Sequence, residues 1–282
     1  MKKILVTGSS GYIGQHLCLY LCKMGYQVTG LDRHDIGGTG CHTFIHQSIL
    51  DTNDIPGDYD AVVHLAALIQ VGMSSKCMME YYRNNVMGTM NMLERLNYDT
   101  FIFASTCQAN QSHTYGKTKL VGEHLVKDYC ESKYVPHTIF RFGNVAGTAG
   151  YKPTNMDGLM YNLIQAKETG TFNLYGNDYD TRDGTALRDY IHLMEVCYAI
   201  EKAIQCPSRF MGSESYPFFE YLGHGIQYTV LECIEAFKKA NNCDFEVIVK
   251  PRRVGDPDST DLYIVSPYMI EKRYSLEEMM KV

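Results

Sequence analysis

A tyrosine and a lysine stand one helical turn apart in the sequence, at Tyr115 and Lys119. Residues at this spacing lie on the same face of a helix, so the two side chains would point the same way. Tyrosine is normally too weak an acid to serve as a base near neutral pH, but a nearby positive charge favours its phenolate and lowers its pKa. The pair therefore predicts a base that removes a proton from a substrate hydroxyl.

Two hydroxyl side chains, Ser105 and Thr106, stand at the carboxyl end of the expected strand Phe101–Ser105. Ligands of open α/β sheets bind at the carboxyl ends of the strands, which is where these hydroxyls would lie. A hydroxyl there can hold the reacting oxygen of a substrate and relay its proton.

A glycine pattern follows the first expected strand, Lys3–Thr7, and opens a helix. Gly8 would permit a tight turn, Gly11 would let the backbone approach a pyrophosphate, and Gly14 would let the helix pack against the strand. The free N–H groups and partial positive charge of the helix N-terminus favour phosphates. The expected cofactor contacts in this turn come from Gly8, Gly11, Tyr12, Ile13 and Gly14.

A carboxylate, Asp32, ends the second expected strand, Gln27–Leu31. It follows the glycines by about 20 residues, where an acidic side chain accepts hydrogen bonds from the adenine ribose of a dinucleotide. A carboxylate there repels a 2′-phosphate, so NAD is expected rather than NADP, although Arg33 stands beside it. The positive nicotinamide ring of NAD would add to the effect of Lys119 on Tyr115.

The elements that must position these groups alternate between strand and helix patterns. Such alternation predicts right-handed βαβ units and a parallel sheet. The fold class is therefore α/β, a Rossmann-type doubly wound parallel sheet with a smaller, interleaved C-terminal substrate lobe. The further strands are expected at Thr43–His46, Ala61–Leu65 and His137–Phe142, and helices at Met79–Leu96 and Tyr115–Glu131, at Asp189–His192 onward, and after a capping box of Thr229 and Glu232.

Regular alternation ends near Asn144, which suggests where the domains divide. We expect residues 1–144 to form the NAD-binding Rossmann domain, with 186–206 and 219–240 packing back on it. Residues 145–185 and 241–282 would form the substrate-binding lobe.

The composition limits the classes of function. A formal net charge of −6 over 282 residues argues against general nucleic-acid binding, which requires a basic face. A signal peptide and a long apolar span are both lacking, so we expect a cytoplasmic protein without membrane contact. Ten scattered cysteines without ligand spacing predict reduced thiols and no metal site.

The assembled residues resemble the extended short-chain dehydrogenase/reductase family, and within it the UDP-glucose (UDP-galactose) 4-epimerases. The resemblance covers almost the whole chain. The stretches that carry it are Asp60–Leu93, Leu174–His192, Tyr221–Val230 and Pro251–Asp256.

This resemblance implies an isomerase that uses NAD to epimerise a UDP-hexose at C4 through a transient 4-keto sugar, working as a homodimer. Thr106 would be the catalytic hydroxyl, Tyr115 the base, and Lys119 a ligand of the nicotinamide ribose. The further cofactor contacts it implies are Ile49, Leu65, Ala66, Ala67, Asn85 and Ser105.

The same resemblance implies a nucleotide-sugar pocket lined by Asn144, Leu159 and Tyr175. Arg188 and Arg253 would bind the diphosphate, which suits guanidinium groups. Asp256 would contact the uridine ribose. Thr260 would set the room for the substituent at C2 of the sugar, so that N-acetylated UDP-hexoses are accepted as well.

The sequence departs from the family pattern at Gly143 and Gly158, where larger residues are usual, and these glycines predict a loose sugar pocket. Two other functions stay open. A sugar-nucleotide 4,6-dehydratase would need an acid–base pair after the central strand, where the run Ser105–Ala109 has no carboxylate. A non-catalytic NAD-binding sensor or scaffold is favoured by the short stretch between Thr106 and Tyr115.

Overall fold

The computed structural model describes residues 1–36, 40–51, 55–148, 150–151, 153, 155–206, 218–253, 256–263, 265–266, 268 and 274–282. The chain divides into two compact units. The first unit contains Met1–Arg141 and Cys197–Glu220, and the second contains Phe142–Val196 and Tyr221–Val282. Val254 and Gly255 of the expected Pro251–Asp256 motif lie outside the described residues.

The strands are β1 (Lys3–Thr7), β2 (Gln27–Asp32), β3 (Thr43–His46), β4 (Asp58–Tyr59), β5 (Ala61–His64), β6 (Asn97–Tyr98), β7 (Phe101–Thr106), β8 (His137–Phe142), β9 (Asn144–Ala146), β10 (Thr171–Tyr175), β11 (Leu187–His192), β12 (Glu220–Leu222), β13 (Gln227–Thr229) and β14 (Glu246–Lys250). The helices are α1 (Tyr12–Lys23), α2 (Val71–Ser74), α3 (Met78–Tyr81), the π-helix η1 (Tyr82–Met87), α4 (Gly88–Arg95), α5 (Thr114–Ser132), α6 (Leu159–Thr169), α7 (Leu193–Gln205), α8 (Val230–Asn241) and α9 (Leu276–Met280).

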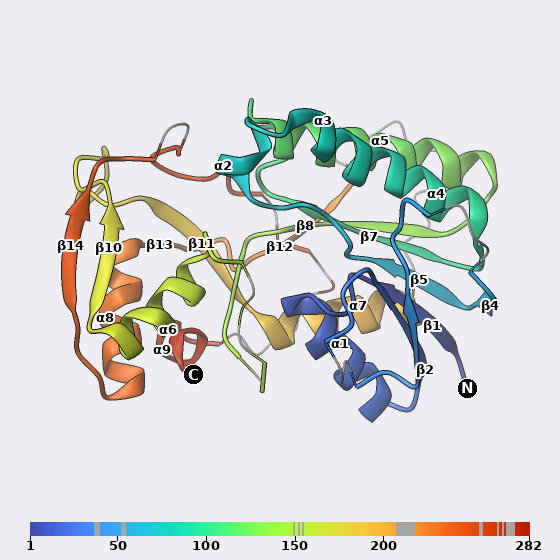
Figure 1. The fold of residues 1–282 in the computed structure, drawn as a ribbon, viewed down its shortest axis with the longest axis horizontal. Coiled ribbons are helices and arrows are strands. Elements are labelled where there is room, and N and C mark those ends of the chain that lie inside the picture. Colours follow the sequence, from blue (N-terminus) through green and yellow to red (C-terminus); the bar gives the residue numbers. More distant parts are fainter. Residues whose placement is uncertain are drawn as a thin grey trace. The chain divides into compact units, whose positions relative to one another are not determined.

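A seven-stranded sheet organises the first unit, in the order β12-β8-β7-β5-β1-β2-β3. The pairs β1–β2, β1–β5, β2–β3 and β5–β7 are parallel. Helices α3, α4 and α5 cover one face of this sheet, and α1 and α7 cover the other (Figure 1). The strand order reverses between β1 and β5, and the carboxyl ends of strands at such a point form the usual ligand crevice.

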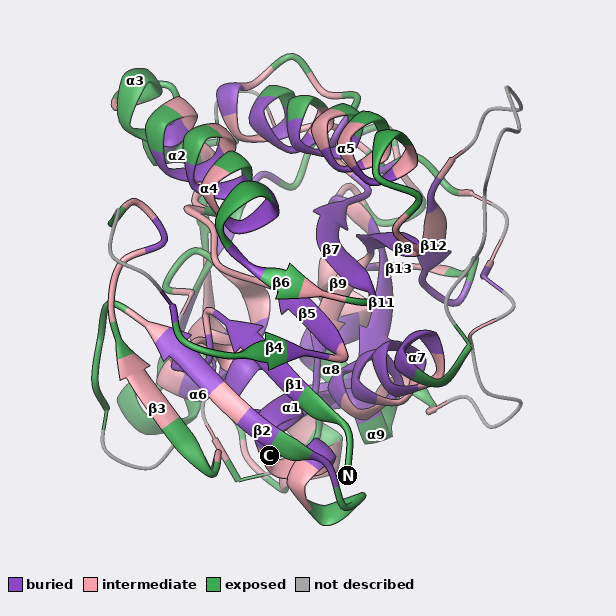
Figure 2. Ribbon diagram, turned by 90° about the vertical axis from the view of Figure 1, so that its right-hand side faces the viewer, coloured by how far each residue is buried: buried purple, intermediate pink, exposed green. Residues whose placement is uncertain are grey.

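The central strands owe their position to continuous apolar runs. Every residue of β5, β7 and β8 is buried, as Figure 2 shows. A strand covered by helices on both faces is expected to have this pattern rather than alternation. The predicted α/β fold class is confirmed.

The long helix expected at Met79–Leu96 is instead α3, η1 and α4 in direct succession. The π-helical turn adds a residue to the turn and is frequent at functional sites. Here it buries two neighbouring amides, Asn84 and Asn85. A pattern read at 3.6 residues per turn cannot show this local change of pitch.

The second unit contains smaller sheets. Strand β10 pairs in parallel with β14, while β11 lies between β9 and β13. Its core includes Phe172, Phe237 and Phe245. The capping box at the start of α8 is present as predicted, with the Thr229 side chain accepting from the Glu232 N–H at 3.1 Å.

One predicted element in the second unit is wrong. The helix expected to begin at Asp189–His192 starts only at Leu193, because the preceding residues form β11. Both edges of β11 are hydrogen-bonded, to β9 and β13, and five of its six residues are buried. A strand buried in this way has no alternating pattern that separates it from the start of a helix.

Across the described ranges, every helix is too short or too polar to cross a bilayer.

Candidate active site

The glycine turn after β1 has the backbone geometry that the sequence predicts. Gly8 has φ +72° and donates its N–H to the Leu31 carbonyl at 2.8 Å. A Cβ atom at Gly8 would lie 2.8 Å from the Ala66 nitrogen, and one at Gly14 would lie 2.1 Å from the Gly8 oxygen. Neither position has room for a side chain, so the turn forms a close backbone cradle that fits a pyrophosphate.

Asp32 fastens this cradle to the end of β2. Its carboxylate accepts from the Ser10 N–H at 3.1 Å and from the His34 N–H at 2.9 Å. The Asp32 side chain is only half-buried, and each carboxylate oxygen has two acceptor sites. It can therefore accept from ribose hydroxyls while it holds the loop.

The segment after β5 lies against the same turn. The Leu65 N–H donates to the Thr7 carbonyl at 3.2 Å, and the Ala66 N–H to the Thr7 hydroxyl at 3.3 Å. That hydroxyl also bonds His64 Nδ1 at 2.7 Å. Burial, and secondarily the charge of Lys119, lower the pKa of His64 to about 3. His64 is therefore a neutral core residue that supports the cofactor loop.

Asn85 fixes the next part of that loop. Its amide accepts from the Leu68 N–H at 2.8 Å and donates to the Leu68 carbonyl at 2.9 Å and the Thr118 hydroxyl at 3.0 Å. Ile49 is buried beneath α4, and a Cβ at Gly88 would lie 2.4 Å from its Cδ1. The structure therefore groups Asn85 and Ile49 with the remaining expected contacts of the loop, Leu65, Ala66 and Ala67, in the first unit.

Tyr115 stands at the first turn of α5, beside the end of β7. Burial raises its pKa well above the ordinary value, a hydrogen bond with the Thr106 side chain partly offsets this, and Cys107 and Tyr81 add to the rise. The protein alone therefore does not produce the expected lowering of the Tyr115 pKa. In the protein without cofactor, Lys119 loses its proton at a lower pH than Tyr115 does, so its charge is absent when Tyr115 titrates.

Lys119 extends from the same helix toward β7. Its Nζ donates to the Ala104 carbonyl at 2.7 Å and lies 4.7 Å from the centre of the Phe103 ring. Burial lowers the pKa of Lys119 to about 8, and the negative charge of Glu123 opposes that shift. The ammonium thus lies shielded from water, where its charge is weakly screened.

Two buried charges next to this lysine were missed in the sequence. Glu123 accepts both Nε and Nη2 of Arg141 at 2.7 Å, and it also accepts the Ser105 hydroxyl. Both ion-pair side chains have no exposed surface. The signals were available: Glu123 is one helical turn beyond Lys119, and Arg141 is a charged residue within an expected strand, between Phe140 and Phe142.

In the second unit, Arg188 and Asp256 bind each other. Arg188 Nη2 donates to Asp256 Oδ1 at 2.5 Å and to the Pro257 carbonyl at 3.0 Å, while Nη1 donates to the Leu187 carbonyl at 2.7 Å. Only 9% of the Arg188 side chain is exposed. The guanidinium therefore holds the 256–258 loop.

Arg253 differs from Arg188 in its exposure. Its guanidinium carbon lies 4.3 Å from the centre of the Tyr175 ring, and Nη1 donates to the Asp157 carbonyl at 3.1 Å. Among the described residues no carboxylate pairs with it. The other expected pocket residues are Asn144 at the start of β9, Leu159 at the start of α6, and Thr260, which is buried and whose carbonyl accepts from Gln227 Nε2 at 2.6 Å.

The two glycines expected to loosen the sugar pocket are closely packed instead. A Cβ at Gly143 would lie 3.0 Å from the Asp189 oxygen, and one at Gly158 would lie 3.1 Å from the Asn155 oxygen. Gly143 also donates its N–H to the Leu222 carbonyl at 2.8 Å. These two glycines let neighbouring backbone segments approach closely, and they do not leave extra space.

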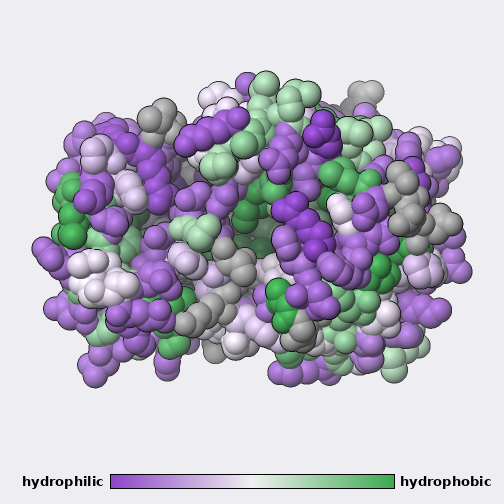
Figure 3. All heavy atoms as spheres, viewed as in Figure 1, coloured by the Kyte–Doolittle hydropathy of each residue, from purple (hydrophilic) through white to green (hydrophobic). Residues whose placement is uncertain are grey.

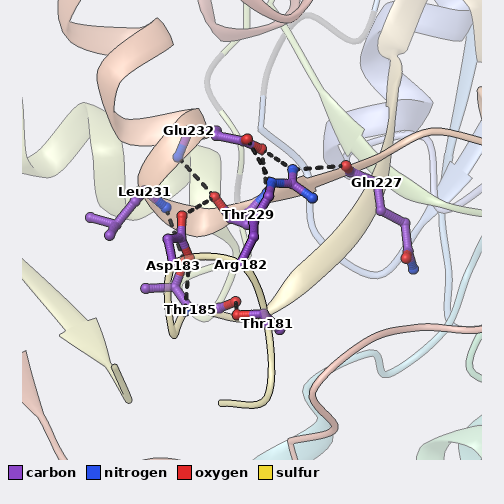
Figure 4. Close-up of polar contacts among 8 residues, drawn as sticks. All are labelled: Thr181, Arg182, Asp183, Thr185, Gln227, Thr229, Leu231 and Glu232. Carbon is purple, nitrogen blue, oxygen red and sulfur yellow. Dashed lines mark hydrogen bonds and ion pairs between the residues drawn. The ribbon is translucent and has the colours of Figure 1, made fainter. Parts of the chain in front are cut away.

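A polar cluster explains much of the Leu174–His192 motif (Figure 4). Arg182 pairs with Glu232 on α8, with its Nε donating to Oε1 at 2.8 Å. Asp183 accepts the Thr229 hydroxyl at 2.5 Å and the Thr185 N–H at 2.9 Å. These side chains dock the turn before β11 onto the start of α8.

A known family accounts for most of this chain. The model of the NAD dependent epimerase/dehydratase family matches residues 4–216. The chain belongs to this family. The family resemblance drawn from the motifs is thereby confirmed, and as a member of this family the chain uses NAD, as predicted.

Its relatives are sugar-nucleotide enzymes. The UDP-glucose 4-epimerase of Rhizobium meliloti is 33% identical over 90% of this chain and 87% of that protein. The crystal structure of UDP-glucose 4-epimerase from Bifidobacterium longum in complex with NAD⁺ and UDP has a TM-score of 0.83 at 26% identity, covering 99% of this chain and 96% of its own. The UDP-Glc/GlcNAc 4-epimerase of Campylobacter jejuni has a TM-score of 0.75 at 26% identity, covering 100% and 97%.

Proposed function

We propose that this member of the family is an isomerase that interconverts UDP-hexoses at C4 through a transient 4-keto sugar. The observation that carries the proposal is the group at α5: Tyr115 bonded to Thr106, with Lys119 one turn further. The glycine cradle belongs to the same unit. The 4-epimerases similar to this chain support the choice of reaction.

In the proposed reaction Tyr115 removes the proton of the 4′-hydroxyl, directly or through Thr106. Bound NAD supplies the acceptor, and afterwards the donor, of the hydride at C4. The 4-keto sugar rotates within the site so that its opposite face meets the hydride, and Tyr115 returns its proton to the oxygen. The configuration at C4 is thereby inverted.

The base needs positive charge, because burial alone keeps the Tyr115 proton in place. We assign that charge to Lys119 together with the cationic ring of NAD. A Lys119 pKa of about 8 leaves the ammonium mostly protonated at neutral pH. In a buried site such a charge acts strongly over a helical turn.

For the nucleotide we assign the main diphosphate contact to Arg253 and the uridine ribose to Asp256. Arg253 is an exposed cation with no carboxylate partner among the described residues, whereas its neighbour Arg252 pairs with Asp178 and Arg188 pairs with Asp256. Arg188 then orients the carboxylate of Asp256 and adds its positive charge to the diphosphate site.

Replacement of Tyr115 by Phe tests the proposal. The variant keeps the ring and loses the proton acceptor, so turnover of UDP-glucose and UDP-galactose should fall by at least about 100-fold while NAD stays bound. Product separation measures turnover, and cofactor content measures binding. Tyr134→Phe, at an exposed tyrosine on the turn after α5, is the matched control. Substantial activity in Tyr115→Phe would refute Tyr115 as the base.

We also propose that the enzyme accepts N-acetylated UDP-hexoses, with Thr260 setting the room at C2 of the sugar. Threonine is small, and Thr260 is buried rather than turned to solvent. Thr260→Tyr should remove activity on the N-acetylated pair selectively, by about 10-fold or more in kcat/KM. Equal loss on both substrate pairs would rule out this gate.

We propose that the active form is a homodimer. Exposed methionines gather on neighbouring short helices, at Met73, Met78, Met79, Met87 and Met90. Apolar surface is visible in Figure 3 where α3 and α5 lie in Figure 1. Light scattering of wild type and Met79→Glu, with Met24→Glu as the exposed control, tests whether this surface joins two copies. A monomeric mass for the wild-type protein would exclude the dimer.

A further inference from the structure

The catalytic helix carries a third ionisable side chain on the face that it shares with Tyr115 and Lys119. Glu123 is one turn beyond Lys119 and fully buried. On strand β8, which neighbours β7 in the sheet, Arg141 is buried equally and donates to both Glu123 oxygens at 2.7 Å. Two parallel bonds of this kind are the geometry that a guanidinium offers and an ammonium does not.

Glu123 has a second cation within reach of its helix face. Lys119 stands at the spacing where lysine and glutamate commonly form an ion pair. Yet the Lys119 ammonium donates to the Ala104 carbonyl, and no ion pair with Glu123 exists in the described part of the chain. The Arg141 fork and the Ser105 hydroxyl already occupy the carboxylate.

The balance of charge explains why this matters. Arg141 stays protonated at any relevant pH, so it and Glu123 form a neutral pair. The ammonium of Lys119 then remains as a net positive charge one turn from the Tyr115 phenol. Without Arg141, the buried Glu123 carboxylate would have Lys119 as its nearest cation, and an unpaired buried carboxylate is costly enough to draw it over.

We propose that Arg141 is a positioning residue for the epimerisation: it occupies Glu123, prevents that carboxylate from pairing with Lys119, and leaves the lysine charge to act on Tyr115. The inference rests on the proposed function, because it takes Tyr115 as the base. Arg141 is itself held in place by the Phe219 ring, 3.8 Å from its guanidinium carbon, and by Asn110 Oδ1 at 3.4 Å.

The first test reads Lys119 directly and needs no turnover. The pKa of Lys119 is followed by NMR of ¹³C-labelled lysine in wild type and Arg141→Met, with Lys119→Met to assign the signal. In Arg141→Met, Glu123 loses its arginine partner and can pair with Lys119, which should raise the Lys119 pKa by about one unit. In the double variant Glu123→Gln/Arg141→Met no carboxylate remains, and the pKa should return to within about 0.3 units of wild type.

The second test follows kcat against pH on the UDP-hexose pair. Because a paired Lys119 no longer stabilises the phenolate, the acid limb of Arg141→Met should move up by about one unit, and kcat at neutral pH should fall about 10-fold. KM and NAD affinity should stay within about threefold, and the double variant should recover. Lys127→Met, which removes a partly buried ion pair further along the same helix, is the control.

A purely structural role predicts a different result. The loss of kcat would then follow the melting temperature, with the acid limb and the Lys119 pKa unmoved, and this outcome overturns the inference while the proposed function stands. If Arg141→Met does not fold, Arg141→Lys decides, because it keeps the charge without the fork and should give a smaller shift in the same direction. Wild-type protein without turnover would overturn the proposed function, and with it the catalytic role of Arg141.

Discussion

The two units hold their functional residues by different means. In the first unit, close backbone contacts and fully buried polar groups fix the site, and its Arg141–Glu123 pair has no exposed surface. In the second unit, the corresponding loops are tied by ion pairs that remain partly in water. The Arg182–Glu232 side chains are 48% and 39% exposed, and those of Arg252 and Asp178 are 37% and 72% exposed.

This difference bears on how each region can respond. Exposed ion pairs contribute little free energy and are weakened by salt, whereas buried networks resist change and respond to pH through the groups they contain. The proposed cofactor side is therefore built as a fixed frame. The proposed nucleotide-sugar side is built largely from contacts that rearrange at low cost, apart from the more deeply buried Arg188 and the buried network of Asp189, Glu195 and His224.

The largest expected effect is the dependence of stability on pH through His64. Burial lowers its pKa from 6.5 to about 3, so the folded state stays neutral while the unfolded chain takes up a proton. Stability from this group is therefore complete above pH 6.5 and is lost as the pH falls toward 3. The linkage amounts to about 3 kcal/mol by pH 4.

Denaturant unfolding of wild type and His64→Gln between neutral and acid pH measures this effect. The variant should lose less stability on acidification by about that amount. His46→Gln, at an exposed histidine on β3, is the control and should follow wild type. Identical slopes for wild type and His64→Gln would show that the buried histidine does not set the acid stability.

Arg188 provides the next test, since its ion pair is more deeply buried than those of Arg182 and Arg252 in the same unit. Arg188→Gln should lower the free energy of unfolding by about 2 kcal/mol, less than for a wholly buried pair because the partner Asp256 is 30% exposed. Arg253→Gln should change stability by less than about 1 kcal/mol but weaken UDP-sugar binding. The reverse order of these stabilities would break the distinction between a structural and a ligand-binding arginine.

The extent to which sequence predicted these regions follows the same division. The glycine turn, the spacing of Tyr115 and Lys119, and the strands β1, β2, β3, β5, β7 and β8 depend on local periodicity and turn chemistry, which a sequence displays. The partner of Arg141 and the pairing of Arg188 with Asp256 join distant segments, and nothing in the local pattern specifies them. Strand β11 was mistaken for a helix because its pairing on both edges is equally non-local.

The smallest expected effect concerns the cluster in Figure 4, where one exposed ion pair and one buried cap hold the same turn. Arg182→Gln should cost less than about 1 kcal/mol, because its pair with Glu232 is half in water. Thr229→Ala should cost more, about 1 to 2 kcal/mol, since the buried Thr229 hydroxyl caps α8 and donates to Asp183. Raising the salt to about 1 M, where the Debye length is about 3 Å, should remove the cost of Arg182→Gln and leave that of Thr229→Ala. Unfolding free energies of both variants at low and high salt decide the matter. If the Arg182 cost persists in high salt, the second unit is held as firmly as the first, and the contrast between them fails.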